Sequence, residues 1–182
     1  MFETEGFIDS CRTALKDTDP RAAIEELVAR TVKQPGLIMH ALGEPKRASV
    51  NVIYKAEDLT ILNLCWGPRL QFHPHDHRMW AVIGIYAGRE QNFFYQRSGQ
   101  GLQRHGMREL DTGDTTRLGR DVIHAVTNPL DQITAAIHVY GGDFFGTPRS
   151  EWDPQTFQER PYDTAAAMRI FEESNARLSA SA

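Results

Sequence analysis

Three histidines lie close together in residues 71–80 of this 182-residue chain, at His73, His75 and His77. In an extended strand all three would point the same way, about 7 Å apart, so two neighbours could converge on one ion. A third ligand must then come from another strand, and His124 qualifies because the intervening chain is long enough to form several strands and return. A lone histidine on an apolar strand is more often a packed residue, but three this close predict a metal site.

A second group of candidate residues falls in residues 134–140, where alternate positions give one small, polar face and one apolar face. The polar face holds Thr134, Ala136, His138 and Tyr140, and the apolar face holds Ala135, Ile137 and Val139. We expect the polar face to line a site inside a barrel and the terminal helices to cover the apolar face. Tyr140 could donate a hydrogen bond into that site while His138 orients it; the alternative is a tyrosine that only packs. His40 and His105 are predicted to be exposed.

The sequence pattern around these residues predicts a β-rich core that positions them. From about Ser49 to Phe145, short runs of Val, Ile, Tyr, Phe and Thr alternate with turn signals, which is typical of a sandwich or small barrel of about eight or more strands. The turn signals are Gly67-Pro68, Ala87-Gly88, Ser98-Gly99, Thr112-Gly113, Asn128-Pro129 and Gly141-Gly142. We therefore expect an all-β core of the jelly-roll type.

Helices are expected at both ends of the chain. Residues 7–33 read as helical, with Asp19 as an N-cap before Pro20, and Gln34-Pro35-Gly36 is predicted to end that segment. The tail, residues 161–178, also reads as a helix, with Asp163 as its N-cap. The expected organisation is one domain over residues 1–182. Residues 1–45 form a helical cover, 46–150 the barrel with the metal site, and 151–182 the C-terminal helix.

Composition excludes several classes of protein. Hydrophobic residues make up 41% and charged residues 24%, as in an ordinary globular domain. A net charge of −4 argues against a nucleic-acid-binding surface. The longest apolar run, residues 81–87, is far shorter than the roughly 20 residues of a membrane span. The N-terminal residues carry no secretion signal, and the two cysteines, Cys11 and Cys65, suit a reducing compartment. We expect a cytoplasmic protein without nucleic-acid or membrane partners; a homo-oligomer stays open.

The pattern resembles the two cupin motifs over roughly residues 60–150. Gly67, His75-x-His77 and Gly88 match the first motif, and Gly113 with His124-x-x-x-Asn128 matches the second. The resemblance implies a double-stranded β-helix (jelly-roll) barrel with N- and C-terminal helices. The usual cupin glutamate ligand is absent, because Ala81 and Val82 stand where it would lie.

Within the cupins, the chain resembles the thiol dioxygenases, which are related to cysteine dioxygenase and include the bacterial 3-mercaptopropionate dioxygenases. It also resembles a group of predicted metal-dependent double-stranded β-helix proteins of unsettled function. The matching segments are His75-Asp76-His77, Trp80, Ile83-Gly84, Gly88-Arg89-Glu90 and Ala136-Ile137-His138-Val139-Tyr140-Gly141. By this resemblance His75, His77 and His124 hold a mononuclear Fe(II), and His138 and Tyr140 act beside it.

The same resemblance has two departures. The family's Ser-x-His-x-Tyr relay has Ala136 in the serine position, so the hydroxyl that would orient His138 is missing. The cysteine that some cysteine dioxygenases cross-link to the tyrosine has no counterpart near Trp80-Ala81, as in the mercaptopropionate-type branch. Arg149 stands nine residues after Tyr140, an offset similar to that of the family's carboxylate-binding arginine, with Arg78 as the alternative.

Three neutral imidazoles leave a divalent ion with its full charge and three of six octahedral positions open, which suits a thiolate together with O2. Imidazole also suits other divalent metals, so the ligand set does not fix the metal. The expected function is oxidation of a small thiol, such as a mercaptocarboxylate or a cysteine-like compound, to its sulfinate by a non-haem iron dioxygenase. Two alternatives remain: a three-histidine dioxygenase that cleaves a carbon–carbon bond of a diketone, and a non-catalytic metal-binding sensor.

Overall fold

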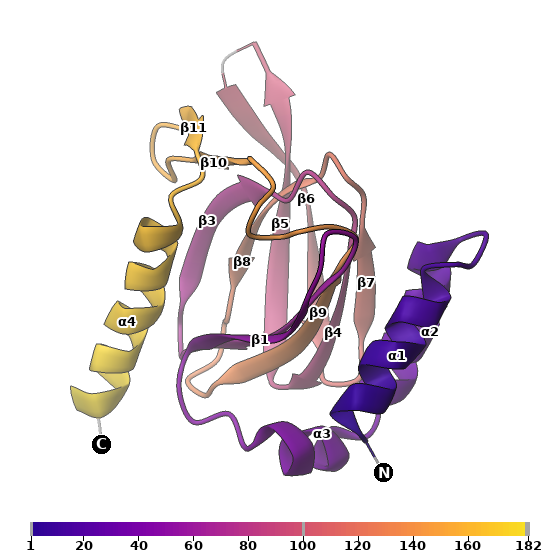
Figure 1. Ribbon diagram of the computed structural model, residues 1–182. Coiled ribbons are helices and arrows are strands. Elements are labelled where there is room, and N and C mark those ends of the chain that lie inside the picture. The colour runs from indigo at the N-terminus through magenta and orange to yellow at the C-terminus, as the bar shows by residue number, and fades with distance from the viewer. Residues whose placement is uncertain (1, 100, 181–182) are drawn as a thin grey trace.

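Two antiparallel sheets facing each other form the core of the computed structural model, which describes residues 2–99 and 101–180 (Figure 1). One sheet has the strand order β1 (Ser49–Lys55), β2 (Thr60–Trp66), β9 (Thr134–Tyr140), β4 (Ala81–Ala87) and β7 (Thr115–Leu118). The other has the order β11 (Glu159–Pro161), β10 (Ser150–Trp152), β3 (Gln71–Asp76), β8 (Ile123–Thr127), β5 (Arg89–Ser98) and β6 (Gly101–Asp111). From β2 onward the chain passes repeatedly between the sheets, as in a jelly roll. The expected all-β jelly-roll core is confirmed.

Strand β9 has the two faces that its sequence predicts. Ala136 and Tyr140 belong to the cluster of buried side chains inside the barrel. Ala135, Ile137 and Val139 instead join a second buried cluster, which they share with apolar residues of the N-terminal helices. The apolar face is therefore covered as expected, and the face that carries His138 and Tyr140 is turned inward.

The N-terminal cover consists of three helices: α1 (Thr4–Ala14), α2 (Pro20–Val32) and α3 (Pro35–Leu42). Asp19 caps α2 as predicted, because its carboxylate accepts a hydrogen bond from the backbone N–H of Ala22. The helical segment expected over residues 7–33 is divided into α1 and α2 at the predicted Asp19-Pro20 helix start. Pro35 does not simply end that stretch: it occupies the first turn of α3, where a proline needs no hydrogen-bond partner for its nitrogen.

Helix α2 packs closely on β4 because Gly84 has no side chain. A Cβ atom at Gly84 would lie 2.4 Å from Cγ1 of Val28 and 2.9 Å from Cγ1 of Val32. We expect Gly84→Ala to lower the free energy of unfolding by about 1–3 kcal/mol, as overpacking does elsewhere, measured by urea unfolding. Gly36→Ala is the matched control, because nothing lies within 4 Å of its added Cβ. Equal stability of the two variants would contradict this packing.

The C-terminal part differs from the expectation. Residues 151–182 are expected to form the C-terminal helix, yet β10 and β11 come first and extend the second sheet next to β3. Helix α4 (Thr164–Ala180) follows, and Asp163 caps it as predicted by accepting from the N–H of Ala166. Figure 1 shows α4 beside β3, on the opposite side of the barrel from α1 and α2. Strands of only three residues carry too little periodicity for the sequence pattern to reveal them.

The six predicted turn signals lie outside or at the ends of the strands. Asn128 shows how one is held: its amide donates to the carbonyls of Trp66, Gly67 and Gln132. Within the described residues, no helix is long and apolar enough to cross a membrane.

Candidate metal centre and its pocket

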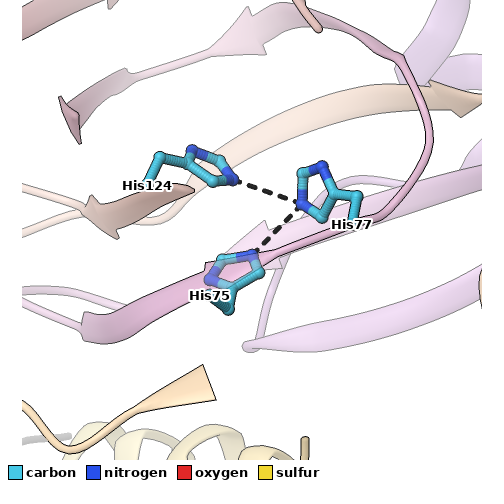
Figure 2. A group of neighbouring side chains, drawn as sticks. All are labelled: His75, His77 and His124. Atoms are coloured by element: carbon cyan, nitrogen blue, oxygen red, sulfur yellow. Dashed lines mark hydrogen bonds between the residues drawn. The ribbon is translucent and has the colours of Figure 1, made fainter. Parts of the chain in front are cut away.

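The three histidines of the predicted metal group meet inside the barrel. His75 on β3 is paired in register with His124 on β8, and His77 follows the end of β3. The Nε2 atom of His77 lies 3.2 Å from Nε2 of His75 and 3.2 Å from Nε2 of His124 (Figure 2). Nitrogens that bind one ion at about 2.1 Å, with angles of about 90–109°, lie about 3.0–3.4 Å apart. The observed spacing fits a shared metal ion.

Hydrogen bonds on the far side of two rings fix which nitrogen faces the centre. Nδ1 of His75 donates to the carbonyl of His73 at 3.0 Å, and Nδ1 of His124 donates to Oδ1 of Asn92 at 2.7 Å. With the ring protons held at Nδ1, both Nε2 atoms present lone pairs to His77. One proton on Nε2 of His77 cannot satisfy both, whereas a cation between the three nitrogens satisfies all of them. The group could therefore hold a metal ion.

The three imidazoles are buried, with exposed fractions of 6% for His75, 2% for His77 and 1% for His124. Burial disfavours the charged imidazolium and lowers the pKa of His124 to about 3; it also lowers the pKa values of His75 and His77 well below the usual value. All three are thus neutral ligands near pH 7. No carboxylate belongs to this group among the residues that the structure describes.

His73 does not share the inward direction of the other two histidines, so the expected alignment of all three is wrong. The pairing of β3 with β8 shifts register between Phe72 and His75, at Pro74, which has no N–H to give to a neighbouring strand. The shift turns the His73 side chain toward Glu151, whose Oε2 lies 3.0 Å from its Nε2. His73 contributes to the centre only through its backbone carbonyl.

His138 and Tyr140 lie beside the centre, as their strand predicts. Both are 2% exposed, and Nδ1 of His138 lies 3.0 Å from the Tyr140 hydroxyl. The Tyr140 ring packs at 5.0 Å from the ring of His77 and at 4.3 Å from that of Phe144. Burial raises the pKa of Tyr140 far above its usual value, so the phenol stays protonated. The pair can therefore hold a proton next to the metal ligands.

The structure separates the two candidate arginines. Arg149 lines the cavity, and its guanidinium lies between the rings of Phe144 and Tyr162, at 3.8 and 4.0 Å from their centres. It also donates to the carbonyl of Phe144, but its Nε is buried without a partner. Arg78 instead pairs with the buried carboxylate of Asp76, at 2.9 Å, and does not line the cavity. Of these two candidates, Arg149 is the one that lines the cavity.

The cavity beside the histidines is small and largely apolar, with a volume of about 60 Å³. Its walls come from both sheets, from the loop after β9 and from α4, which contributes Ala167, Met168 and Phe171. A much larger groove of about 550 Å³ lies elsewhere and is lined by His73 rather than by the ligand trio. The three histidines of the candidate metal group line the small cavity, which makes it the candidate site.

Sequence reasoning missed two parts of this site. Asn92, which orients His124, lies on β5 outside both histidine segments. The available signal was the spacing of Glu90 and Asn92, which are two positions apart and are the two buried residues of this strand. The part of the cavity wall that α4 supplies was missed, because the pattern of an amphipathic helix indicates which of its faces is buried but does not indicate what that face packs against. His40 and His105 are exposed, as predicted.

No family model matches the sequence. Partial similarity to solved structures exists. The DMSP lyase structures (RdDddP and RnDddQII) match at 20% identity with a TM-score of 0.40, over 50% of this chain and 42% of that chain. A variant of Bacillus subtilis oxalate decarboxylase matches at 15% identity with a TM-score of 0.41, over 50% of this chain and 23% of that chain. The Schizosaccharomyces pombe Cnp3 cupin domain matches at 7% identity with a TM-score of 0.44, over 53% of this chain and 61% of that chain.

The chain has a jelly-roll barrel of two antiparallel sheets with the three-histidine group inside it. The matched part is less than two thirds of each of these three chains, so their activities describe those proteins alone.

Proposed function

We propose that the chain is a non-haem iron dioxygenase that oxidises a small thiol to its sulfinate. The reaction consumes one thiol and one O2, and both oxygen atoms end on sulfur. The observation that carries the proposal is a small apolar cavity that combines three neutral histidines with one buried tyrosine and one half-buried arginine, whose Nε is buried. An iron ion, when bound, would supply the redox chemistry and hold the thiolate and O2 together.

His75, His77 and His124 are the residues that would hold the iron. Because all three are neutral, an anionic ligand is favoured at the open positions, and a thiolate is both anionic and soft. The apolar wall from α4 excludes water and keeps these interactions strong. The small cavity favours a compact substrate over a bulky one. Arg149 would meet a carboxylate at the far end of that substrate.

The direct test is a panel of thiols presented to the iron-loaded protein in an oxygen electrode, with product masses determined afterwards. The expected result is O2 uptake with a mass gain of two oxygen atoms on a small mercaptocarboxylate. A diketone added to the same panel tests the first alternative, because uptake with its carbon skeleton cleaved would favour a diketone-type dioxygenase instead. Absence of uptake with every thiol, despite full iron loading, would contradict the proposal, and absence with the diketone as well would favour a sensor.

Tyr140→Phe is expected to keep the metal and lower turnover by about 10²-fold, because it removes one proton-bearing group from the site. The ring and its packing on His77 and Phe144 remain in the variant. Metal content and steady-state oxygen uptake measure the two effects separately. Turnover equal to the parent's would mean that Tyr140 only packs. Ala136→Ser, which restores a hydroxyl two residues before His138, is expected to raise turnover with a mercaptocarboxylate.

A further inference from the structure

A buried carboxyl, Glu90 on β5, lies behind His138 and belongs to neither the metal group nor the cavity wall. It is fully buried, and its Oε2 accepts a hydrogen bond from Trp66 Nε1 at 2.7 Å while its Oε1 accepts from Asn92 Nδ2 at 2.8 Å. Among the described residues no lysine or arginine pairs with it. Burying an ionised carboxyl without a nearby cation is unfavourable unless neighbouring groups form hydrogen bonds with it.

The ring of His138 supplies the missing partner. Its Nε2 is buried with no hydrogen-bond partner, and Oε2 of Glu90 lies 3.9 Å away. Its Nδ1 is already engaged with the Tyr140 hydroxyl. Ala136 offers no polar atom that could serve Nε2 instead. A separation of 3.9 Å is longer than a hydrogen bond, but such contacts in ligand-free sites often tighten when a ligand binds.

We propose that Glu90, His138 and Tyr140 form a three-residue proton relay, in which Glu90 positions the His138 ring and is the final acceptor of the proton that a bound thiol loses. This proposal rests on the proposed function in one respect, namely that the ligand is a thiol. The role of Glu90 in setting the protonated nitrogen of His138 stands on the geometry alone.

Protons balance along this relay. At rest the Glu90 carboxylate faces Nε2–H of His138 at 3.9 Å, and Nδ1 of His138 accepts from the Tyr140 hydroxyl. When a thiol binds, its S–H proton passes to the Tyr140 oxygen, the phenolic proton passes to Nδ1, and the Nε2 proton passes to Glu90. The thiol becomes a thiolate and the carboxylate becomes a neutral carboxyl. Tyr140 and His138 each receive one proton, give one up and remain neutral.

The buried environment suits this order of transfer. Burial raises the pKa of Glu90 from 4.5 to about 7, which narrows the gap between this carboxyl and an ordinary thiol of pKa about 8.5. Burial, with the nearby His124 second, lowers the pKa of His138 to about 3, so this ring transmits a proton and does not retain it. The groups that face Glu90 are Trp66 from β2, Asn92 from its own strand and His138 from β9. Beyond these, the nearest titratable groups are Tyr140, on the far side of His138, and His124, on the far side of Asn92.

The ring nitrogens of His138 can be observed directly by ¹⁵N NMR in the zinc-loaded protein, which needs no substrate. At pH 8.5 the His138 ring of the parent is expected to carry its proton on Nε2. In Glu90→Gln the proton is expected on Nδ1 of His138, because the amide of the new glutamine can donate toward Nε2. Glu151→Gln is the matched control, since Glu151 is an equally buried carboxyl that contacts His73 instead. It should change the His73 signals and leave those of His138 unchanged. A proton on Nδ1 in the parent at pH 8.5 would overturn the relay.

The proton count on thiol binding gives a second readout, while the NMR spectrum of the parent covers the case in which Glu90→Gln folds poorly. Titration calorimetry of the zinc-loaded protein with 3-mercaptopropionate is run at pH 7, where the Glu90 carboxyl is about half ionised, in buffers of different ionisation enthalpy. The parent is expected to release up to about half a proton less per thiol than Glu90→Gln, which has no carboxylate to take one up. Equal proton release by the parent and by Glu90→Gln would contradict Glu90 as the acceptor. If no thiol binds, the proposed function fails, and the NMR experiment still decides the role of Glu90.

Discussion

Replacing His75, His77 or His124 by alanine is expected to lower the iron content at least about 10-fold and to abolish thiol oxidation. Each variant leaves two imidazoles, and a site with two ligands binds a divalent ion far more weakly than one with three. No carboxylate of the described chain belongs to the group that could replace the lost ligand. Metal analysis after anaerobic loading with Fe(II) and dialysis measures this effect.

His105→Ala is the matched control, because His105 is an exposed histidine of the same barrel and lies outside the trio. It should retain both iron and activity. Unchanged metal content in two of the three ligand variants would rule out the three-histidine site. The same series with zinc or manganese in place of iron shows which ion the site prefers, since neutral imidazoles accept several divalent metals.

Much of this site could be predicted because its signals are local. His75 and His77 are separated by two positions, and the alternation of β9 places His138 and Tyr140 on the inward face. The turn signals mark strand ends because glycine, proline and asparagine favour backbone conformations that strands do not use. These features depend on neighbouring residues in the chain, so a single sequence reveals them.

The remaining features depend on contacts between distant segments. The register shift at Pro74 turns His73 away, although simple alternation places it beside His75. Asn92 reaches His124 only because β5 and β8 are neighbours in the second sheet. Pairing between strands is set by the whole core, and hydrophobic periodicity reports burial without reporting the partner.

Arg149→Ala is expected to lower kcat/KM for thiols with a carboxylate by about 10- to 150-fold. The guanidinium lies between Phe144 and Tyr162, with its Nε buried and unpartnered, so a ligand carboxylate would complete its hydrogen bonding. A charge-assisted hydrogen bond of this kind contributes roughly 1.5–3 kcal/mol, and about 1.4 kcal/mol corresponds to tenfold. Steady-state kinetics with 3-mercaptopropionate measure the loss.

The neutral analogue 3-mercaptopropanol separates ligand binding from a structural role of Arg149. It has the same length and thiol but no carboxylate, so its kcat/KM should change little in Arg149→Ala. Arg149→Lys should recover only part of the activity toward the acid, because an ammonium group cannot reproduce the two parallel hydrogen bonds of a guanidinium. Arg78→Ala should not select between the two thiols, since Arg78 pairs with Asp76 outside the cavity. Equal losses for the acid and the alcohol in Arg149→Ala would mean that this arginine holds the pocket wall and does not bind the substrate.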